Sequence, residues 1–287
     1  MTGRGASGEG LLVLRHDDAR LVVDPKHGGA LREFRCLGHE VLRPSAPDAT
    51  DPFELGAFAM VPYANRIANG HFTLRGQTVQ LRPNWAGDPH PLHGQGWLAC
   101  WQVVDASSAE ATLRFEGGGD AWPWRYAVEE HVRVAPSALA LRLSVENLSA
   151  TPMPAMLGLH PYFGDPGHAR LEAHVPRVWT TDRAALPVAE VRTPPDWSFE
   201  PGRPVGAIPL DHSFVGWGGE AQVRWPDRRL TLRATNCRCL HVYVPQGRDF
   251  FCLEPQTAAA GALSRDRDEA HFVQRYAIAV TLELGVS

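Results

Sequence analysis

Residues 138–146 read Ala138-Leu139-Ala140-Leu141-Arg142-Leu143-Ser144-Val145-Glu146. Leucine or valine occupies every second position, and the residues between them are small, polar or charged. Because successive side chains of a β-strand point to opposite faces, this alternation is typical of a strand with one buried face and one solvated face.

The same alternation recurs along the chain. Apolar residues occupy every second position from Tyr276 to Leu284. Short strand-like runs also flank the turn signals Arg75-Gly76-Gln77 and Pro226-Asp227, which indicates two hairpins. The 24 prolines and 27 glycines are spread along the chain, as expected when many turns join many strands. We therefore predict an all-β fold, a large antiparallel β-sandwich.

Helical periodicity is nearly absent. The best helical candidate, residues 264–274, is short and highly charged. Residues 177–209 are proline-rich and poorly periodic, which favours a long connection within the domain. Residues 1–10 are glycine-rich and polar, and we expect a flexible N-terminus there, followed by a single domain over residues 11–287.

Composition narrows the class of partner. The net charge of −4 is mild, and no lysine- or arginine-rich block predicts binding to nucleic acid or to a membrane surface. A small neutral or weakly charged ligand suits this balance. No apolar run has the length of a membrane span, and the N-terminus lacks the apolar core of a signal peptide, so we expect a cytoplasmic protein. The oligomeric state is left open.

The five cysteines are odd in number and scattered through strand-like segments: Cys36, Cys100, Cys237, Cys239 and Cys252. Zinc sites usually separate paired cysteines by two to four residues, whereas a single residue lies between Cys237 and Cys239. This spacing favours structural thiols over a metal or redox site.

Glu254 ends the apolar run of residues 250–253, within Leu253-Glu254-Pro255-Gln256. A glutamate at a strand end often caps a turn or pairs with an arginine. A continuous apolar run, however, predicts burial on both faces, and burial raises the pKa of a carboxyl group unless hydrogen-bond donors compensate. A raised pKa suits a general base.

Two histidines lie in similarly marked contexts. His160 precedes Pro161-Tyr162-Phe163, so its backbone is extended and the rings of Tyr162 and Phe163 could form an apolar wall against a ligand. His93 follows Pro91-Leu92, in a loop fixed by prolines and a glycine. The His90/His93 spacing could suggest a metal clip, but Pro91 prevents the helix on which such pairs act, and we predict no metal site.

Three further polar residues are candidates for binding. Asn65 and Arg66 follow an apolar segment, and an arginine offers five fixed donors to hydroxyl or carboxylate oxygens. Asp211 follows the proline-rich connection and could accept hydrogen bonds from the hydroxyl groups of a ligand. Structural roles, in turns and ion pairs, are open to all three.

Four of these segments, in this order, resemble motifs of the aldose 1-epimerase (galactose mutarotase) family. They are residues 65–70, Leu92-His93-Gly94, the segment around His160, and Leu253-Glu254-Pro255-Gln256. Together they extend the resemblance over nearly the whole chain. Asp211 is similar to the family's sugar-binding aspartate on a shorter context.

The resemblance implies a galactose mutarotase-like β-supersandwich and an enzyme that interconverts the α and β anomers of an aldose without metal or organic cofactor. Glu254 would be the general base at the C1 hydroxyl, and His160 the general acid at the ring oxygen. His93 and Arg66 would steady the ring oxygen and neighbouring hydroxyls, while Asn65 and Asp211 would orient the sugar. Activity is expected to fall when Glu254 gains a proton or His160 loses one.

The resemblance leaves the substrate open. Residues 163–166 lack the asparagine-leucine continuation of the best-known galactose mutarotases and look like a shorter bacterial branch. One alternative is a hexose-6-phosphate 1-epimerase, which needs further cations besides Arg66. Another is a sugar-binding protein without catalysis, and a third is a glycosidase that uses Glu254 and Asp211 as paired carboxylates.

Overall fold

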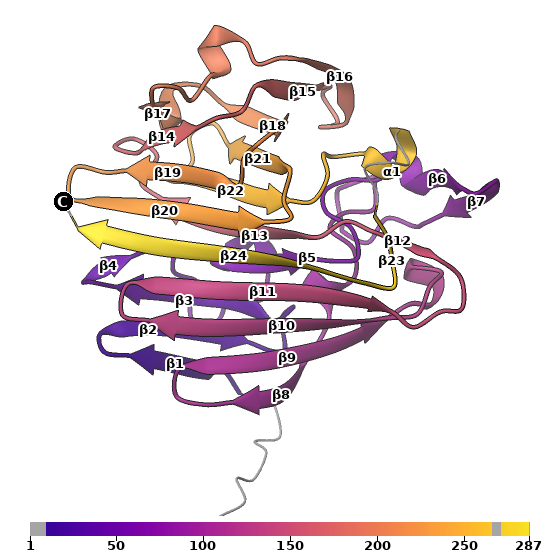
Figure 1. Cartoon of the computed structure of the whole chain (residues 1–287), viewed down its shortest axis with the longest axis horizontal. Coiled ribbons are helices and arrows are strands. Elements are labelled where there is room, and N and C mark those ends of the chain that lie inside the picture. Colours follow the sequence, from indigo (N-terminus) through magenta and orange to yellow (C-terminus); the bar gives the residue numbers. More distant parts are fainter. Residues whose placement is uncertain (1–9, 266–270, 287) are drawn as a thin grey trace, which may run out of the picture.

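The computed structural model describes residues 10–265 and 271–286. Within them, two large sheets lie one behind the other, the nine-stranded sheet in front and the indigo strands of the eleven-stranded sheet behind it (Figure 1). Strand pairings in both sheets are antiparallel, and side chains from both sheets share one hydrophobic core. The predicted all-β, antiparallel sandwich is confirmed.

The eleven-stranded sheet carries the candidate site. Its strands follow in the order β1 (Leu12–His16), β2 (Ala19–Asp24), β3 (Ala30–Cys36), β5 (Ala57–Met60), β13 (Gly158–Gly164), β22 (Phe250–Gln256), β21 (Cys239–Val244), β18 (Leu210–Val215), β15 (Arg177–Thr181) and β16 (Pro187–Arg192), with β4 (His39–Glu40) attached to β3.

The nine-stranded sheet covers the opposite side of the core. Its strands follow in the order β17 (Arg203–Pro204), β14 (Arg170–Ala173), β19 (Glu220–Arg224), β20 (Arg228–Thr235), β24 (Arg275–Val286), β11 (Ala138–Asn147), β10 (Tyr126–Ala135), β9 (Glu110–Gly117) and β8 (Gln102–Ala106).

Smaller elements connect the sheets. The hairpin of β6 (His71–Leu74) and β7 (Gln77–Gln80) forms one two-stranded sheet, and β12 (Met153–Ala155) with β23 (His271–Val273), distant in sequence, forms another. The helices are short: α1 (Ala262–Arg265) and the 3₁₀ turns Pro52–Glu54, Ala68–Gly70, Gly96–Leu98, Gly119–Ala121, Pro195–Trp197 and Val205–Ala207. In the described ranges, no helix has the length and apolar character needed to cross a bilayer.

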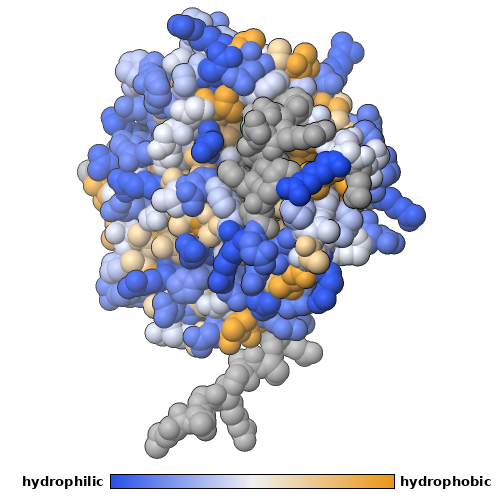
Figure 2. Space-filling view, turned by 45° about the vertical axis from the view of Figure 1, so that its right-hand side comes forward, coloured by the Kyte–Doolittle hydropathy of each residue, from blue (hydrophilic) through white to orange (hydrophobic). Residues whose placement is uncertain are grey.

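The alternation in residues 138–146 sets the inner face of β11. Leu139, Leu141, Leu143 and Val145 are at most 2% exposed, whereas Ala140 and Arg142 face solvent. The leucines face Leu282, Val280 and Ile278 of β24 across the sheet, so two alternating sequences bury matching apolar faces. On the face of the molecule drawn in Figure 2, most surface side chains are hydrophilic, and hydrophobic side chains occur there in small groups.

The expectation of a long connection over residues 177–209 is wrong. Residues 177–209 contain β15 and β16, which pair and extend the eleven-stranded sheet, although their sequence lacks clear alternation. Most of their side chains are only partly buried, which explains the weak pattern. Among residues 264–274, the best helical candidate, residues 264–265 belong to α1 and residues 271–273 form β23 against β12; residues 266–270 lie outside the described chain. The N-terminal segment expected to be flexible also lies outside it, apart from Gly10.

Glu130 of β10 is a buried acid in the core, 1% exposed, and burial raises its pKa to about 8. In the unfolded chain the carboxyl ionises near its ordinary value of 4.5, while the folded protein keeps the proton up to about pH 8. Stability therefore falls as pH rises through this window, by a few kcal/mol at most.

We predict that Glu130→Gln stabilises the protein at pH 8 relative to wild type and has little effect near pH 4.5. Urea unfolding at both pH values measures this. Glu129→Gln is the matched control, because Glu129 lies on the outer face in a solvent-exposed ion pair with Arg114, which contributes little. An equal loss of stability at both pH values for Glu130→Gln would contradict the prediction.

Candidate active site

Three neighbouring strands of the eleven-stranded sheet place ionisable side chains in one row. The register of β13 against β22 brings His160 across from Glu254. On the other side of β22, His241 of β21 is the register partner of Glu254. Directly opposed residues of antiparallel strands share a face, so Glu254 lies between two imidazoles. We call this set the His160–Glu254–His241 row.

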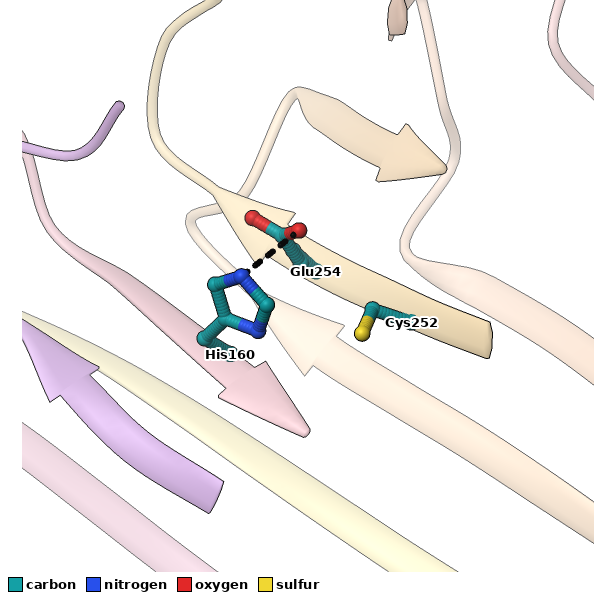
Figure 3. Close-up of side chains that lie close together, drawn as sticks. All are labelled: His160, Cys252 and Glu254. Carbon is teal, nitrogen blue, oxygen red and sulfur yellow. Dashed lines mark ion pairs between the residues drawn. The ribbon is translucent and has the colours of Figure 1, made fainter. Parts of the chain in front are cut away.

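His160 and Glu254 form a buried pair. His160 Nε2 lies 3.2 Å from Glu254 Oε1, and the residues are 5% and 1% exposed (Figure 3). The Gln256 side-chain amide donates a 2.9 Å hydrogen bond to the other carboxyl oxygen. Burial raises the pKa of Glu254 to about 7 and lowers the pKa of His160 to about 3. The predicted rise in the pKa of Glu254 is therefore present.

His241 is the site residue that the sequence analysis missed. Its Nε2 lies 2.9 Å from Asp211 Oδ1, and its Nδ1 lies 3.0 Å from Ser213 Oγ. Burial acts to lower the pKa of His241, but Glu254 and Asp211 outweigh it and the pKa is raised. The pKa of Asp211 is lowered, because its bond to His241 outweighs burial. These shifts favour the charged forms of both partners, an aspartate and an imidazolium, beside Glu254.

A signal for His241 was present in the sequence. It is a titratable residue in the middle of the apolar strand Cys239–Val244, where every neighbour along the strand is apolar or aromatic. An ionisable residue in such a strand is expected to be buried. Because a buried polar group needs hydrogen-bond or ion-pair partners, His241 could have been selected on this ground.

Asn65 and His93 are bound to each other by two hydrogen bonds. The Asn65 backbone N–H donates to His93 Nδ1, and the His93 backbone N–H donates to the Asn65 carbonyl, both at 3.1 Å. Gly94, the residue after His93, has φ +75°, and a Cβ there would lie 2.1 Å from the Val61 carbonyl oxygen. Only glycine lets this loop approach Val61, the residue after β5, so closely.

The same hydrogen bonds fix the tautomer of His93. Burial lowers the pKa of His93 well below its ordinary value, so the ring is neutral. Since Nδ1 accepts a hydrogen bond from Asn65, Nε2 carries the proton. His93 is thus a fixed hydrogen-bond donor beside the His160 ring, whose centroid lies 5.4 Å away.

All six residues selected from the sequence line one cavity of about 460 Å³, together with His241. The six are Asn65, Arg66, His93, His160, Asp211 and Glu254. This volume lies within the range of roughly 300–1,000 Å³ that is usual for small-molecule sites. Arg66 is held at the cavity by an ion pair from its Nε to Asp88, at 2.8 Å.

The aromatic wall differs in part from the expectation. Tyr162 lines the cavity and stacks on His160 with a centroid distance of 4.7 Å, as expected of the residue two positions along the strand. Phe163 points to the opposite face of β13 and packs in the hydrophobic core. The expectation for Phe163 is therefore wrong, because adjacent strand residues alternate between faces.

A second, wider depression of about 900 Å³ adjoins the cavity and shares Arg43 and Arg248 with it. None of the residues of the His160–Glu254–His241 row lines it. The smaller cavity is therefore the one equipped for proton transfer.

Metal ligation needs donors that converge. His90 is engaged elsewhere, since its Nδ1 accepts a hydrogen bond from the Asn69 backbone. In the described part of the chain, one His/Cys/Glu group has converging donors: His160, Cys252 and Glu254, with donor atoms within 4.8 Å of one another. None of the five cysteines forms a disulfide, and all except Cys100 are buried, as structural thiols are.

Comparison with known proteins places this geometry in a family. The profile of the family described as Aldose 1-epimerase matches residues 10–272. The uncharacterized protein YphB of Escherichia coli (strain K12) is 29% identical over 263 residues, which cover 87% of this chain and 88% of YphB.

Solved structures share the fold. A crystal structure from Escherichia coli K12, of a protein whose assignment as an aldose 1-epimerase is provisional, superposes with a TM-score of 0.90 at 26% identity, over 97% of this chain and 99% of that chain. A galactose mutarotase-like protein from Clostridium acetobutylicum gives a TM-score of 0.86 at 18% identity, over 96% and 95% of the two chains. The predicted galactose mutarotase-like fold is confirmed, and the chain belongs to the aldose 1-epimerase family.

Proposed function

We propose that this protein is a mutarotase, an enzyme that interconverts the α and β anomers of an aldose by acid–base ring opening and closure. The observation that carries the proposal is the contact of 3.2 Å between His160 Nε2 and Glu254 Oε1, buried at the wall of a sugar-sized cavity. A base and an acid at one place are what the reaction needs, since O1 loses a proton while the ring oxygen O5 gains one.

In the proposed mechanism Glu254 accepts the proton of the C1 hydroxyl, and His160 protonates O5. The C1–O5 bond breaks and the free aldehyde forms. After rotation about C1–C2, O5 attacks the other face of C1, His160 recovers its proton and Glu254 returns one to O1. The site ends in its starting protonation state, so no cofactor takes part in the balance.

Without substrate, the single proton of the His160–Glu254 pair is on a different residue from the one that the sequence analysis predicted. With a pKa of about 7 for Glu254 and about 3 for His160, the pair carries one proton between these values, mainly on Glu254. The proposed mechanism needs that proton on His160 instead. The cationic His241 on the far side of Glu254 favours the carboxylate form and so supports transfer of the proton across the 3.2 Å contact.

The remaining residues are suited to hold the sugar. His93 offers its Nε2–H as a donor. One carboxyl oxygen of Asp211 is hydrogen-bonded to His241, and the other can accept a hydrogen bond from a sugar hydroxyl. Asn65 acts by shaping the loop, because its side-chain oxygen accepts the Arg66 backbone N–H at 2.8 Å, and Arg66 retains terminal guanidinium donors beyond its Nε contact with Asp88.

We predict that Glu254→Gln and His160→Asn each lower kcat by at least about 10²-fold while the protein stays folded, the usual scale for loss of an acid–base group. Polarimetry on fresh α-D-glucose or α-D-galactose measures the rate, and circular dichroism checks the fold. His212→Asn is the matched control, because His212 stacks on Trp197 and does not line the cavity.

Rates near wild type in either site variant would refute the proposed roles. A wild-type protein that binds aldoses without accelerating mutarotation would instead support the alternative of a sugar-binding protein without catalysis.

The pH dependence follows from the single proton of the pair. Below about pH 7, one member of the His160–Glu254 pair carries a proton that it can donate, and the other can accept one. The value of kcat/KM should therefore be constant from pH 5 to pH 6.5. Above about pH 7 the pair loses its proton and O5 has no acid, so kcat/KM should fall about tenfold per pH unit. Polarimetry corrected for the buffer-catalysed rate measures this profile. A rate that rises through pH 7 would show that carboxylate and neutral imidazole are the active form.

A phosphorylated aldose is the second candidate substrate, favoured by three arginines at the cavity. Arg43 donates to the Phe53 carbonyl oxygen at 2.6 Å, and Arg66 is paired with Asp88. Arg248, on the exposed loop between β21 and β22, has no ion pair or hydrogen bond with any residue that the structure describes. It is the cation with its full charge available to a phosphate at the cavity rim.

For a phosphorylated substrate, Arg248→Gln is expected to lower kcat/KM about tenfold or more on glucose 6-phosphate and to leave glucose unaffected, since a charged hydrogen bond contributes about 1.5–3 kcal/mol. Gln246→Ala, in the same exposed loop, is the control. Polarimetry with each sugar, with and without inorganic phosphate as an inhibitor, measures the effect. Equal kinetics of wild type and variant on both sugars would remove this alternative.

A further inference from the structure

The His160–Glu254 pair has a third neighbour that the proposed mechanism does not use. Cys252 precedes Glu254 by two residues on β22 and therefore points to the same face of the sheet. One donor atom each from His160, Cys252 and Glu254 lies within 4.8 Å of the other two, and all three residues are buried (Figure 3).

Two polar atoms of this region lack a partner. His160 Nδ1 is buried with no hydrogen bond to another residue in the described structure, although Nε2 of the same ring contacts Glu254. The side-chain oxygen of Gln256 is also buried and unpartnered, while its amide group bonds Glu254. Buried polar atoms are nearly always satisfied, so unpartnered ones indicate a site that takes a further atom.

The donor set has the chemistry of a zinc site. One imidazole nitrogen, one thiolate sulfur and one carboxylate oxygen are each usual ligands of Zn²⁺, which accepts four ligands in a tetrahedron. Mg²⁺ and Ca²⁺ prefer all-oxygen sites and match this set poorly. Because His160 and Glu254 line the cavity, an ion can enter from it, and a water can supply the fourth ligand.

Charge balance also favours a divalent ion. Binding displaces two protons to solvent, the proton of the Cys252 thiol and the one shared by the His160–Glu254 pair, which leaves a thiolate, a carboxylate and a neutral imidazole against the two charges of the ion. The resulting site is neutral, and burying a neutral site avoids the cost of burying an isolated charge.

We propose that His160, Cys252 and Glu254 form an inhibitory zinc site superimposed on the proton-transfer pair. A zinc ion bound there occupies the carboxylate and the imidazole together, so neither O1 nor O5 of a sugar finds its partner. The metal-free protein is the active form, and zinc and sugar exclude each other from the cavity.

The test measures mutarotation by polarimetry while Zn²⁺ is added to the metal-free protein, with Mg²⁺ as the control ion. We expect Zn²⁺ to inhibit, chelator to restore the rate, and saturating sugar to raise the half-inhibitory zinc concentration. For Cys252→Ala and Cys252→Ser, the half-inhibitory zinc concentration is determined with each variant's own metal-free rate as full activity. It should be at least about tenfold higher than in wild type, since even residues that only support metal ligands change metal affinity on this scale. Cys100→Ala, which removes the exposed thiol, should behave as wild type.

A second readout does not depend on activity. Cd²⁺ bound to a thiolate gives an ultraviolet charge-transfer band, which should form in wild type and Cys100→Ala and be lost in both Cys252 variants. Absence of this band in wild type, or equal zinc inhibition of wild type and the Cys252 variants, would overturn the proposal. Because the band is measured without sugar, it separates failure of the zinc site from failure of the proposed mutarotase function.

Discussion

The arrangement of the site depends on strand register. His160, Glu254 and His241 come from three stretches of sequence, and backbone hydrogen bonding between β13, β22 and β21 brings them into one row. A slip of one residue between any two of these strands would turn a member of the row to the other face of the sheet. The apolar residues that alternate with the row face the shared core, so the packing that stabilises the sandwich also fixes the position of the proton-transfer groups.

Burial then determines the chemistry of these groups. Phe58 and Tyr162 lie against His160 with centroid distances of 4.7 Å each and keep its ring oriented toward Glu254. The same low-polarity surroundings raise the pKa of the carboxyl and lower the pKa of the imidazole, so the pair shares one proton near neutral pH. On the other side of Glu254, His241 lowers the pKa of the carboxyl group, and Asp211, which is bonded to His241, acts in the opposite direction.

The sequence predicted much of the fold, because alternation such as that of residues 138–146 is a local property of the chain. It did not reveal β15 and β16, whose side chains are half-exposed and carry no clear period. For the site, the six selected residues line one cavity, but their roles remain proposals. His241 was missed and Phe163 misassigned, since cross-strand partners and the direction of each side chain follow from register, which a single sequence does not contain.

The position of β24 has a consequence for how the molecule is made. In sequence, residues 275–286 come after all the other strands of the nine-stranded sheet. In the sheet, however, β24 lies between β20 and β11 and is hydrogen-bonded to both. On a ribosome, the β8–β11 meander and the β19–β20 hairpin emerge first and have no direct bond to each other. They become one sheet only when residues 275–286 have left the exit tunnel. A nascent chain therefore exposes two open strand edges until residues 275–286 have been made, and unpaired edges of this kind are prone to aggregate.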